Sequence, residues 1–402
     1  MSALPQSVAA PARVPRGVWV LGFVSLLMDV SSELIHSLLP VFMVTSLGAS
    51  ALVVGLVEGI AEATALIVRV FSGALSDYLG KRKGLAVAGY GLGALSKPLF
   101  AFAATVGWVL TARFLDRIGK GIRGAPRDAL IADVTPANLR GASYGLRQAL
   151  DTVGAFAGPL LAIALMTLTH DRFRFVFWIA VLPAFASVLL LLVSVDEPER
   201  SRNPNAKPPV LRAMLGTLGP QYWLVVTVAT LFTLARFSEA FLILKAADAG
   251  FSAASVPLVL VAMNVAYALS AYPAGKWSDR ASRWAILGLG AGLLIASDLV
   301  LASTDSVGGA LAGIALWGVH LGCTQGLFAA LVADTASPEQ RGTAFGVFNL
   351  VTGVALLAAS ALAGVVWDRF GPAATFLTGA TFAALSTAAA LALHATGRLG
   401  GK

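Results

Sequence analysis

The segment GALSDYLGKRK, residues 73–83, separates two long apolar stretches, and its first five positions recur in altered form as GKWSD at residues 275–279. A second segment, DVTP at residues 133–136, recurs as DTASP at residues 334–338. Both pairs are about 200 residues apart, which is half of the 402-residue chain. Matching segments at a fixed spacing indicate an internal repeat, so we interpret the chain as two related halves.

The composition is that of a membrane protein. Hydrophobic residues make up 57% of the chain and charged residues only 12%, about half of the roughly 25% in a typical soluble domain. A soluble protein of this length could not bury so much apolar surface, so a soluble enzyme is excluded and we expect no enzymatic activity. The apolar residues form long unbroken runs rather than the alternating pattern of a membrane β-barrel, which indicates helices.

Each half contains six apolar stretches that are long enough to cross a membrane as helices, for which about 20 residues are needed. They lie near residues 17–45, 52–75, 84–104, 107–133, 141–167 and 174–195, and near residues 221–246, 255–276, 284–303, 308–335, 342–367 and 372–394. We therefore predict an all-α membrane protein with twelve transmembrane helices in two pseudo-symmetric six-helix bundles.

The predicted units are a cytosolic tail at 1–16, the first bundle at 17–195, a cytosolic linker at 196–220, the second bundle at 221–394 and a cytosolic tail at 395–402. The first tail is polar and carries three prolines, and no small-residue cleavage site ends the apolar stretch that follows. We therefore expect a retained first helix and not a removed signal peptide.

Lysine and arginine indicate the orientation, because they gather on the cytosolic side of membrane proteins. With the N-terminus inside, most of those outside the helices fall in cytosolic segments, whereas the outer loops hold only Arg172, Arg174, Lys245 and Arg369. The net charge of +8 is thus a topology signal and does not indicate a nucleic-acid partner. We expect a multi-pass protein of the cytoplasmic membrane with both termini in the cytosol.

The loop at residues 73–83 resembles the motif between helices 2 and 3 of the major facilitator superfamily, and the resemblance covers nearly the whole chain. Residues 113–119, RFLDRIG, resemble the family's helix 4 motif, whose arginine is linked to proton coupling. Asp116 and Arg117 stand here in place of its usual Gln-Gly. The resemblance implies a secondary active transporter that alternates between inward-open and outward-open states, with Arg113 taking part in the coupling to protons.

The fifth predicted helix, at residues 141–167, has a glycine spacing that resembles the motif of the family's antiporters. The matching residues are Gly145, Gly154, Gly158 and Pro159, whereas Ala162-Ile163 replaces the final glycine pair. This resemblance implies export of a small solute in exchange for protons. Two other interpretations stay open, namely proton-coupled uptake of an organic anion or a metal chelate, and efflux of a divalent metal. A sensor that has kept the fold without transporting is a more remote alternative.

Charged residues at helix ends predict two cytosolic gates that mirror each other. The predicted gate residues are Asp77, Lys81, Asp133, Asp279, Arg283 and Asp334. In each half, the aspartate of the loop motif would face the positive N-terminus of a helix in the other half, near residue 342 or residue 141. Lys81 would pair with Asp133, and Arg283 with Asp334. These contacts would break as the halves rock, unless the residues are only solvated loop charges.

Ionisable residues at membrane depth are costly and usually functional. We predict that proton coupling and substrate binding involve Asp29, Glu33, His36, Glu58, Glu62, Arg113, Asp116, Arg117, Lys120, Arg236 and Glu239. Glu33 and Asp29, facing Arg113 or Arg117, would form the coupling site, because burial favours a protonated carboxyl and a nearby arginine favours an ionised one. The alternative is a fixed ion-pair network that locks helices 1, 2 and 4 together. The second half also offers Asp298, His320 and Gln325.

The charges leave the substrate open. The fourth predicted helix, at residues 107–133, carries five cations and one acid in a stripe. The first two, at residues 17–45 and 52–75, carry four acids, so the charges could balance without an anionic substrate. At the cytosolic end of this stripe, Arg123 and Arg127 could snorkel to water or lipid headgroups. The metal alternative rests on Asp29, Glu33 and His36, which share one helix face.

No cofactor is expected. Cys323 is the single cysteine, which excludes an internal disulfide and a cysteine-based metal site. The chain also lacks a phosphate-binding loop, which argues against a pump driven by ATP. We expect a monomer whose partners are a small-molecule or ion substrate, protons and the lipid bilayer.

Overall fold

The computed structural model describes residues 14–79, 81–136, 139–196, 218–278, 283–324, 327–336 and 341–395. Within these ranges the regular structure is helical, as predicted. The first half contains α1 (Arg16–His36), α2 (Leu39–Leu47), α3 (Ala51–Leu79), α4 (Arg82–Phe102), α5 (Val106–Val134), α6 (Arg140–Thr169) and α7 (Phe173–Ser194). The second half contains α9 (Pro220–Ala235), α10 (Ala240–Asp248), α11 (Leu258–Ser278), α12 (Arg283–Ser303), α13 (Val307–Thr324), α14 (Leu327–Thr335) and α15 (Arg341–Ala395).

The first membrane-spanning segment of each half is interrupted. In the first half, α1 ends before Ser37 and α2 begins at Leu39, with Pro40 in its first turn. Proline is tolerated there because the first N–H groups of a helix have no partner within that helix. In the second half, residues 236–239 separate α9 from α10. Both interruptions place irregular backbone inside the protein, where it borders the site described below.

The helices account for twelve membrane crossings. Ten helical segments of the described chain are long and apolar enough to cross a membrane. The charged helix α5 is the eleventh crossing, although its composition removes it from a count based on hydropathy. The twelfth comes from α15, which Gly371 divides by adopting φ 84° and ψ 175°, a conformation that favours glycine. The predicted fold class is confirmed, and an even number of crossings places both chain ends on one side of the membrane.

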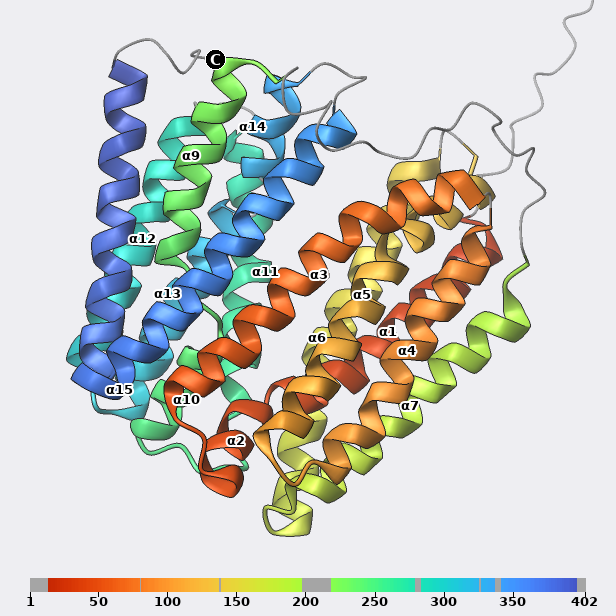
Figure 1. The fold of residues 1–402 in the computed structure, drawn as a ribbon, viewed down its shortest axis with the longest axis horizontal. Coiled ribbons are helices and arrows are strands. Elements are labelled where there is room, and N and C mark those ends of the chain that lie inside the picture. Colours follow the sequence, from red (N-terminus) through yellow and green to blue (C-terminus); the bar gives the residue numbers. More distant parts are fainter. Residues whose placement is uncertain are drawn as a thin grey trace, which may run out of the picture.

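The two halves form separate bundles that meet along α3 and α15 (Figure 1). The two helices run antiparallel and approach closely at small residues. A Cβ atom at Gly59 would lie 3.1 Å from the Cα of Leu357, and one at Gly353 would lie 3.5 Å from the Cα of Ala63. Glycine at such contacts allows helix backbones to pack tightly, which is a main source of helix association in membranes.

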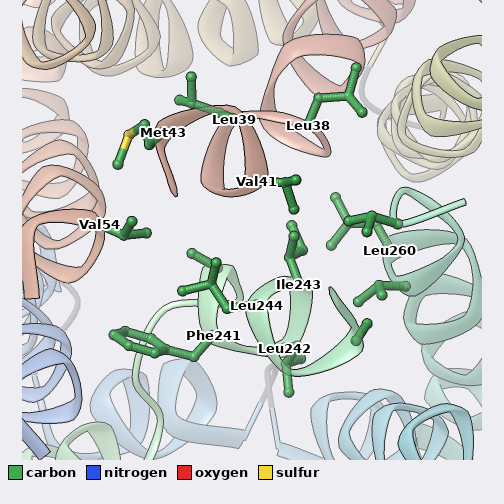
Figure 2. Packing of buried hydrophobic residues seen from close by; sticks show 14 of the residues in the cluster. Leu38, Leu39, Val41, Met43, Val54, Phe241, Leu242, Ile243, Leu244 and Leu260 are labelled. Carbon is green, nitrogen blue, oxygen red and sulfur yellow. The ribbon is translucent and has the colours of Figure 1, made fainter. Parts of the chain in front are cut away.

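The end of this interface that lies far from Arg16 is closed by α2 and α10. Figure 2 shows Val41 of the first half beside Ile243 and Leu244 of the second half, and all three side chains are buried. At the same end, Asp368 on α15 accepts hydrogen bonds from the backbone N–H groups of Ala51 and Leu52, at 2.9 and 3.0 Å. This carboxylate caps the N-terminus of α3, so one half satisfies a helix end of the other.

Candidate functional site

A cavity of about 470 Å³ lies between the two halves. The wall from the first half is strongly charged and includes Asp29, Glu33, His36, Glu58, Glu62, Arg117, Lys120 and Asp151. The wall from the second half presents Arg236 and Glu239 at the α9–α10 interruption and is otherwise mainly apolar or aromatic, through Phe237, Leu260, Met263, Tyr267, Trp317, Leu321 and Leu356. The cavity therefore has one charged face and one largely apolar face.

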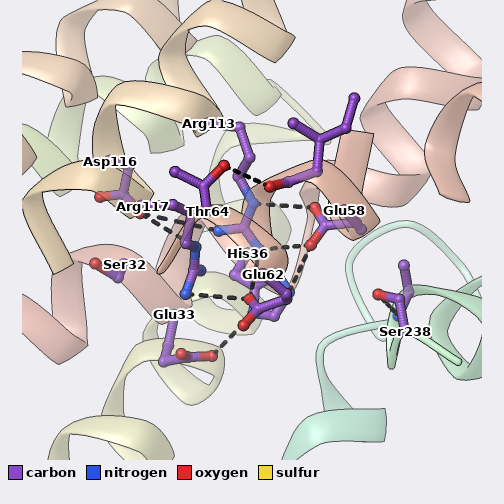
Figure 3. A network of polar contacts seen from close by, with 12 residues as sticks. Ser32, Glu33, His36, Glu58, Glu62, Thr64, Arg113, Asp116, Arg117 and Ser238 are labelled. Carbon is purple, nitrogen blue, oxygen red and sulfur yellow. Dashed lines mark hydrogen bonds and ion pairs between the residues drawn. The ribbon is translucent and has the colours of Figure 1, made fainter. Parts of the chain in front are cut away.

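A chain of ion pairs leads from this cavity into the first bundle (Figure 3). His36, in the last turn of α1, lies between two acids: its Nδ1 is 3.5 Å from Oε2 of Glu33, and its Nε2 is 3.5 Å from Oε2 of Glu58 on α3. Arg113 on α5 donates to both carboxylate oxygens of Glu58, at 3.1 and 2.6 Å. Through His36, Glu33 at the cavity wall is therefore connected to a buried bidentate pair.

A second branch of the network extends to α4. Arg117 Nη1 lies 3.2 Å from Oε1 of Glu62, and Arg117 Nε lies 3.6 Å from Oδ2 of Asp116. Lys97 on α4 donates to Asp116 at 2.7 Å and to the hydroxyl of Ser32 at 3.0 Å. The network thus joins α1, α3, α4 and α5.

Lys97 is a network residue that the sequence analysis missed. Its side chain is buried, and it neutralises the one acid of the α5 charge stripe. The sequence could have identified it, because Lys97 is an ionisable residue inside an apolar stretch, as Arg113 is.

The arginines have partners other than the predicted ones. We expected Asp29 and Glu33 to face Arg113 or Arg117, but Arg113 pairs with Glu58, and Arg117 with Glu62. The reason is the order of the helices, since α5 packs extensively against α3, whereas α1 packs mainly against α6 and α7. Charge spacing on one helix identifies a shared face but not the helix that this face meets.

Asp29 and Lys120 are charged residues that line the cavity. Within the described part of the chain, neither makes an ion pair within 4 Å, whereas Asp151 pairs with Arg147 at 2.5 Å. Asp29 and Lys120 are therefore placed to contact a solute. Over the same described ranges, no group of three or more His, Cys, Asp or Glu side chains is arranged to hold a metal ion. The alternative metal site at Asp29, Glu33 and His36 thus has no support from this geometry.

The glycine motif of α6 brings α1 close to this site. A Cβ atom at Gly154 would lie 2.9 Å from Cβ of Asp29, and one at Gly158 would lie 2.7 Å from Cβ of Glu33. Two of the predicted glycines thus set the position of the two predicted coupling acids, next to Pro159. Gly145 differs, because a Cβ atom there would meet nothing within 4 Å.

The predicted gates are described only in part. Asp279 and the side chains of Asp77 and Arg283 lie outside the described residues, and Lys81 and Asp334 are exposed. Asp133 pairs with Arg82 rather than with Lys81: Arg82 Nη1 donates to Asp133 Oδ2 at 2.6 Å and to the carbonyl of Ala129 at 2.9 Å. Arg82 begins α4, which packs along α5, and this packing brings its guanidinium to Asp133.

Arg123 and Arg127, which could have snorkelled to water or lipid headgroups, are buried in the first bundle. The guanidinium of Arg123 lies 4.9 Å from the ring centroid of Tyr90, and Arg127 donates to the hydroxyl of Ser25 at 2.9 Å. The Ser25 hydroxyl is in turn 2.9 Å from the hydroxyl of Tyr90. Arg127 also pairs with the carboxylate of Asp128 at 3.1 Å, so an aromatic face, a hydroxyl group and a carboxylate surround these two guanidinium groups inside the bundle.

Comparisons with known proteins agree with this architecture. A family model described as Major Facilitator Superfamily matches residues 21–359 and 228–399. An uncharacterized MFS-type transporter of Methanocaldococcus jannaschii is 33% identical over 379 residues, which cover 92% of this chain and 93% of the relative. The multidrug resistance protein MdtH of Photorhabdus laumondii subsp. laumondii is 33% identical over 163 residues, which cover 40% of this chain and 39% of the relative.

A solved structure shows the same fold at low sequence identity. The crystal structure of a POT family transporter in complex with 5-aminolevulinic acid superposes with a TM-score of 0.80 and 12% identity, and covers 94% of this chain and 96% of that chain. The match of the family model over most of the chain agrees with the repeated loop motif and the twelve crossings. The chain is therefore a multi-pass transporter of the cell membrane that belongs to the Major Facilitator Superfamily.

Proposed function

We propose that this chain exports a small amphipathic solute in exchange for protons. The observation that supports this most directly is the position of His36, which lies at the cavity wall between Glu33 and Glu58. A group that can bind a proton from the cavity is thereby joined to the buried pair of Glu58 and Arg113. Proton coupling needs such a link between a titrating site and a structural contact.

In this proposal, a proton that enters from the cavity binds at Glu33 or His36. A protonated His36 competes with Arg113 for the carboxylate of Glu58. Arg113 already has two other acids within reach, since its guanidinium lies 3.8 Å from Glu62 and 4.0 Å from Asp116. A shift of Arg113 towards them would change how α3 and α5 line the cavity. The protonated and unprotonated states would then differ in solute affinity, which antiport requires.

The two faces of the cavity support an amphipathic solute. The apolar face of the second half would bind a hydrocarbon or aromatic part, and the charged face would bind a polar group. The name of MdtH describes a multidrug resistance protein, which supports export. The described walls of the cavity come from the two halves of one chain, and we therefore propose a monomer as the transporting unit.

Uptake of an organic anion is the second candidate function. Lys120 and Arg236 lie on opposite walls of the cavity, and two cations so placed could hold a carboxylate or phosphate group between them. The direction of coupled flux separates this candidate from export.

Proteoliposomes that contain the purified full chain and an internal pH-sensitive dye test the proposal. The probes are ethidium, tetraphenylphosphonium, salicylate and Ni²⁺, each applied with an imposed pH gradient. We expect a lipophilic probe to leave the compartment that protons enter. Fluxes in the same direction would contradict antiport and favour uptake, and binding without flux for all probes would favour a sensor.

The variant Glu33→Gln tests the coupling site. We expect it to lose flux driven by the pH gradient while it still binds the transported probe. Asp305→Asn is a matched control, because Asp305 is 98% exposed and lies away from the cavity. Wild-type coupling in Glu33→Gln would remove Glu33 from the mechanism.

A further inference from the structure

Asp298, on α12, is a buried carboxyl group that the proposed coupling network does not use. Its side chain has no exposed surface, and neither carboxyl oxygen has a hydrogen-bond partner within the described ranges. It also lies outside the lining of the cavity. An ionised carboxylate without partners is strongly unfavourable inside a membrane protein, so its position requires an explanation.

Three elements meet at the Asp298 carboxyl group. A Cβ atom at Gly379 on α15 would lie 2.7 Å from Oδ2 of Asp298, 3.0 Å from a ring carbon of Phe237 and 3.3 Å from the carbonyl oxygen of Ala235. Ala235 is the last residue of α9. Carbonyl groups in the last turn of a helix lack the N–H partners of a following turn, so an acceptor lies close to the buried acid.

The ionisable groups around Asp298 do not neutralise it. The neighbouring elements present His320 and Cys323 from α13, and Arg236 and Glu239 from the α9–α10 interruption. His320 Nδ1 contacts the carbonyl of Gly290, and Arg236 and Glu239 line the cavity. Across the described part of the molecule, no cation forms an ion pair with Asp298 within 4 Å, and the backbone of Gly379 on α15 lies beside its carboxyl group.

The donor set fits a proton better than a metal ion. Hard cations such as Ca²⁺ and Mg²⁺ take about six or more oxygen ligands. The atoms gathered here are two carboxyl oxygens and the carbonyl of Ala235, next to an aromatic ring. A proton requires only one carboxyl oxygen, and the resulting O–H group can donate to a nearby carbonyl.

We propose that Asp298 is a proton-binding site whose bound proton ties α12 to the end of α9, and that release of this proton accompanies movement of the α9–α10 interruption. An ionised Asp298 would need water or the guanidinium of Arg236, and either can arrive only if residues 236–239 rearrange. These residues form part of the cavity wall, so the rearrangement would change the wall that the second half presents to the solute. The geometry around Asp298 supports the binding of a proton there. The role of this proton in transport rests on the proposed function.

Infrared difference spectroscopy of the full chain in lipid nanodiscs tests the bound proton without any substrate. We expect the wild type to show the C=O stretch of a protonated carboxyl at neutral pH. Asp298→Asn should remove that band, and Glu33→Gln should retain it. The asparagine keeps the shape of the side chain and can still donate to a carbonyl, so the fold should be preserved. An unchanged spectrum in Asp298→Asn, or a band that disappears when Na⁺ replaces K⁺, would overturn the proposal.

A glycine pair tests the location of the site. Gly379→Ala introduces a methyl group against Oδ2 of Asp298, whereas Gly292→Ala on α12 places one where nothing lies within 4 Å. We expect the first substitution to shift the frequency of the band or the pH at which it disappears, and the second to leave both unchanged. A band that is the same in Gly379→Ala would contradict the assigned position.

The flux assay separates this inference from the proposed function. If the wild type shows no proton flux linked to any probe while the Asp298 band behaves as expected, antiport fails and the proton site stands. If antiport occurs, we expect Asp298→Asn to lower the ratio of protons to transported probe. An unchanged ratio in that variant would overturn the role of Asp298 in transport.

Discussion

Arg113 and Glu58 form a bidentate ion pair between α5 and α3, with Nε donating to Oε1 at 3.1 Å and Nη2 donating to Oε2 at 2.6 Å. Both side chains are almost fully buried. Without the Glu58 charge, the buried Arg113 keeps the more distant acids Glu62, at 3.8 Å, and Asp116, at 4.0 Å, so Glu58→Gln should lower the free energy of unfolding by about 3 kcal/mol, the lower end of the range for a broken buried ion pair. Chemical or thermal unfolding of the purified protein in detergent measures this loss.

Glu62→Gln is the matched control for that prediction, since Glu62 lies one turn further along α3 and its side chain is 31% exposed. We expect it to cost less than Glu58→Gln, because the Glu62 carboxylate is partly exposed at the cavity and Arg117 keeps Asp116 at 3.6 Å. Equal losses in the two variants would show that the pair of Glu58 and Arg113 has no special structural role.

Gly158→Ala should disturb the proposed coupling site by moving the backbone of α1. The added methyl group would lie 2.7 Å from Cβ of Glu33 and 3.0 Å from the carbonyl oxygen of Val30, so α1 must move away from α6. Overpacking of this kind costs about 1–3 kcal/mol, and we expect flux driven by a pH gradient to fall with it. Gly145→Ala on the same helix meets nothing within 4 Å and should behave as the wild type in both assays.

The fold could be predicted from the sequence because its signals are local. A run of apolar residues specifies a membrane helix by itself, so the stretch expected at 84–104 appears as α4, Arg82–Phe102. The interruption after α9 was not predicted, because Arg236 and Glu239 lie inside a long apolar stretch and were interpreted as charges within one helix, and no proline marks the break. Hydropathy likewise underestimates α5, in which Arg113, Asp116 and Arg117 pair with charged residues of neighbouring helices.

The candidate site was predictable as a set of residues but not as a set of pairs. Ionisable residues in apolar stretches stand out one by one, and Asp29, Glu33, His36, Glu58 and Glu62 all line the cavity. Which charge meets which depends on how the helices pack, and no pattern within one helix contains that information. This is why Arg113 meets Glu58 and Asp133 meets Arg82.

Lys97 and Asp116 should behave as one unit. The pair is buried, with Nζ 2.7 Å from Oδ1. Lys97→Met alone leaves the acid without its closest cation, and Asp116→Asn alone leaves the ammonium group without its acid, so each should cost about 3–5 kcal/mol. The double variant should recover much of that loss, because neither charge then remains unpaired. Unfolding measurements on the three variants give the coupling energy, and strictly additive losses would contradict the pairing.

Asp368 should act as a latch at the α2–α10 end of the interface. It caps α3 across the two halves through the N–H groups of Ala51 and Leu52, and such a contact exists only while these helices stay together. Loss of a helix cap costs about 0.5–2 kcal/mol, so Asp368→Ala should shift the balance towards separation of the halves at this end by roughly 2-fold to 30-fold.

Distances between spin labels on α2 and α10 measure that balance in a Cys323→Ser background, which removes the single native thiol. Asp305→Ala serves as the control, because Asp305 is 98% exposed and its contact with Lys245 of α10, at 3.4 Å, lies within the second half and does not join the two halves. We expect a larger fraction of long distances in Asp368→Ala and an unchanged distribution in Asp305→Ala. If the distribution in Asp368→Ala equals that of the wild type, the apolar contacts of Val41, Ile243 and Leu244 hold this end closed without help from the cap.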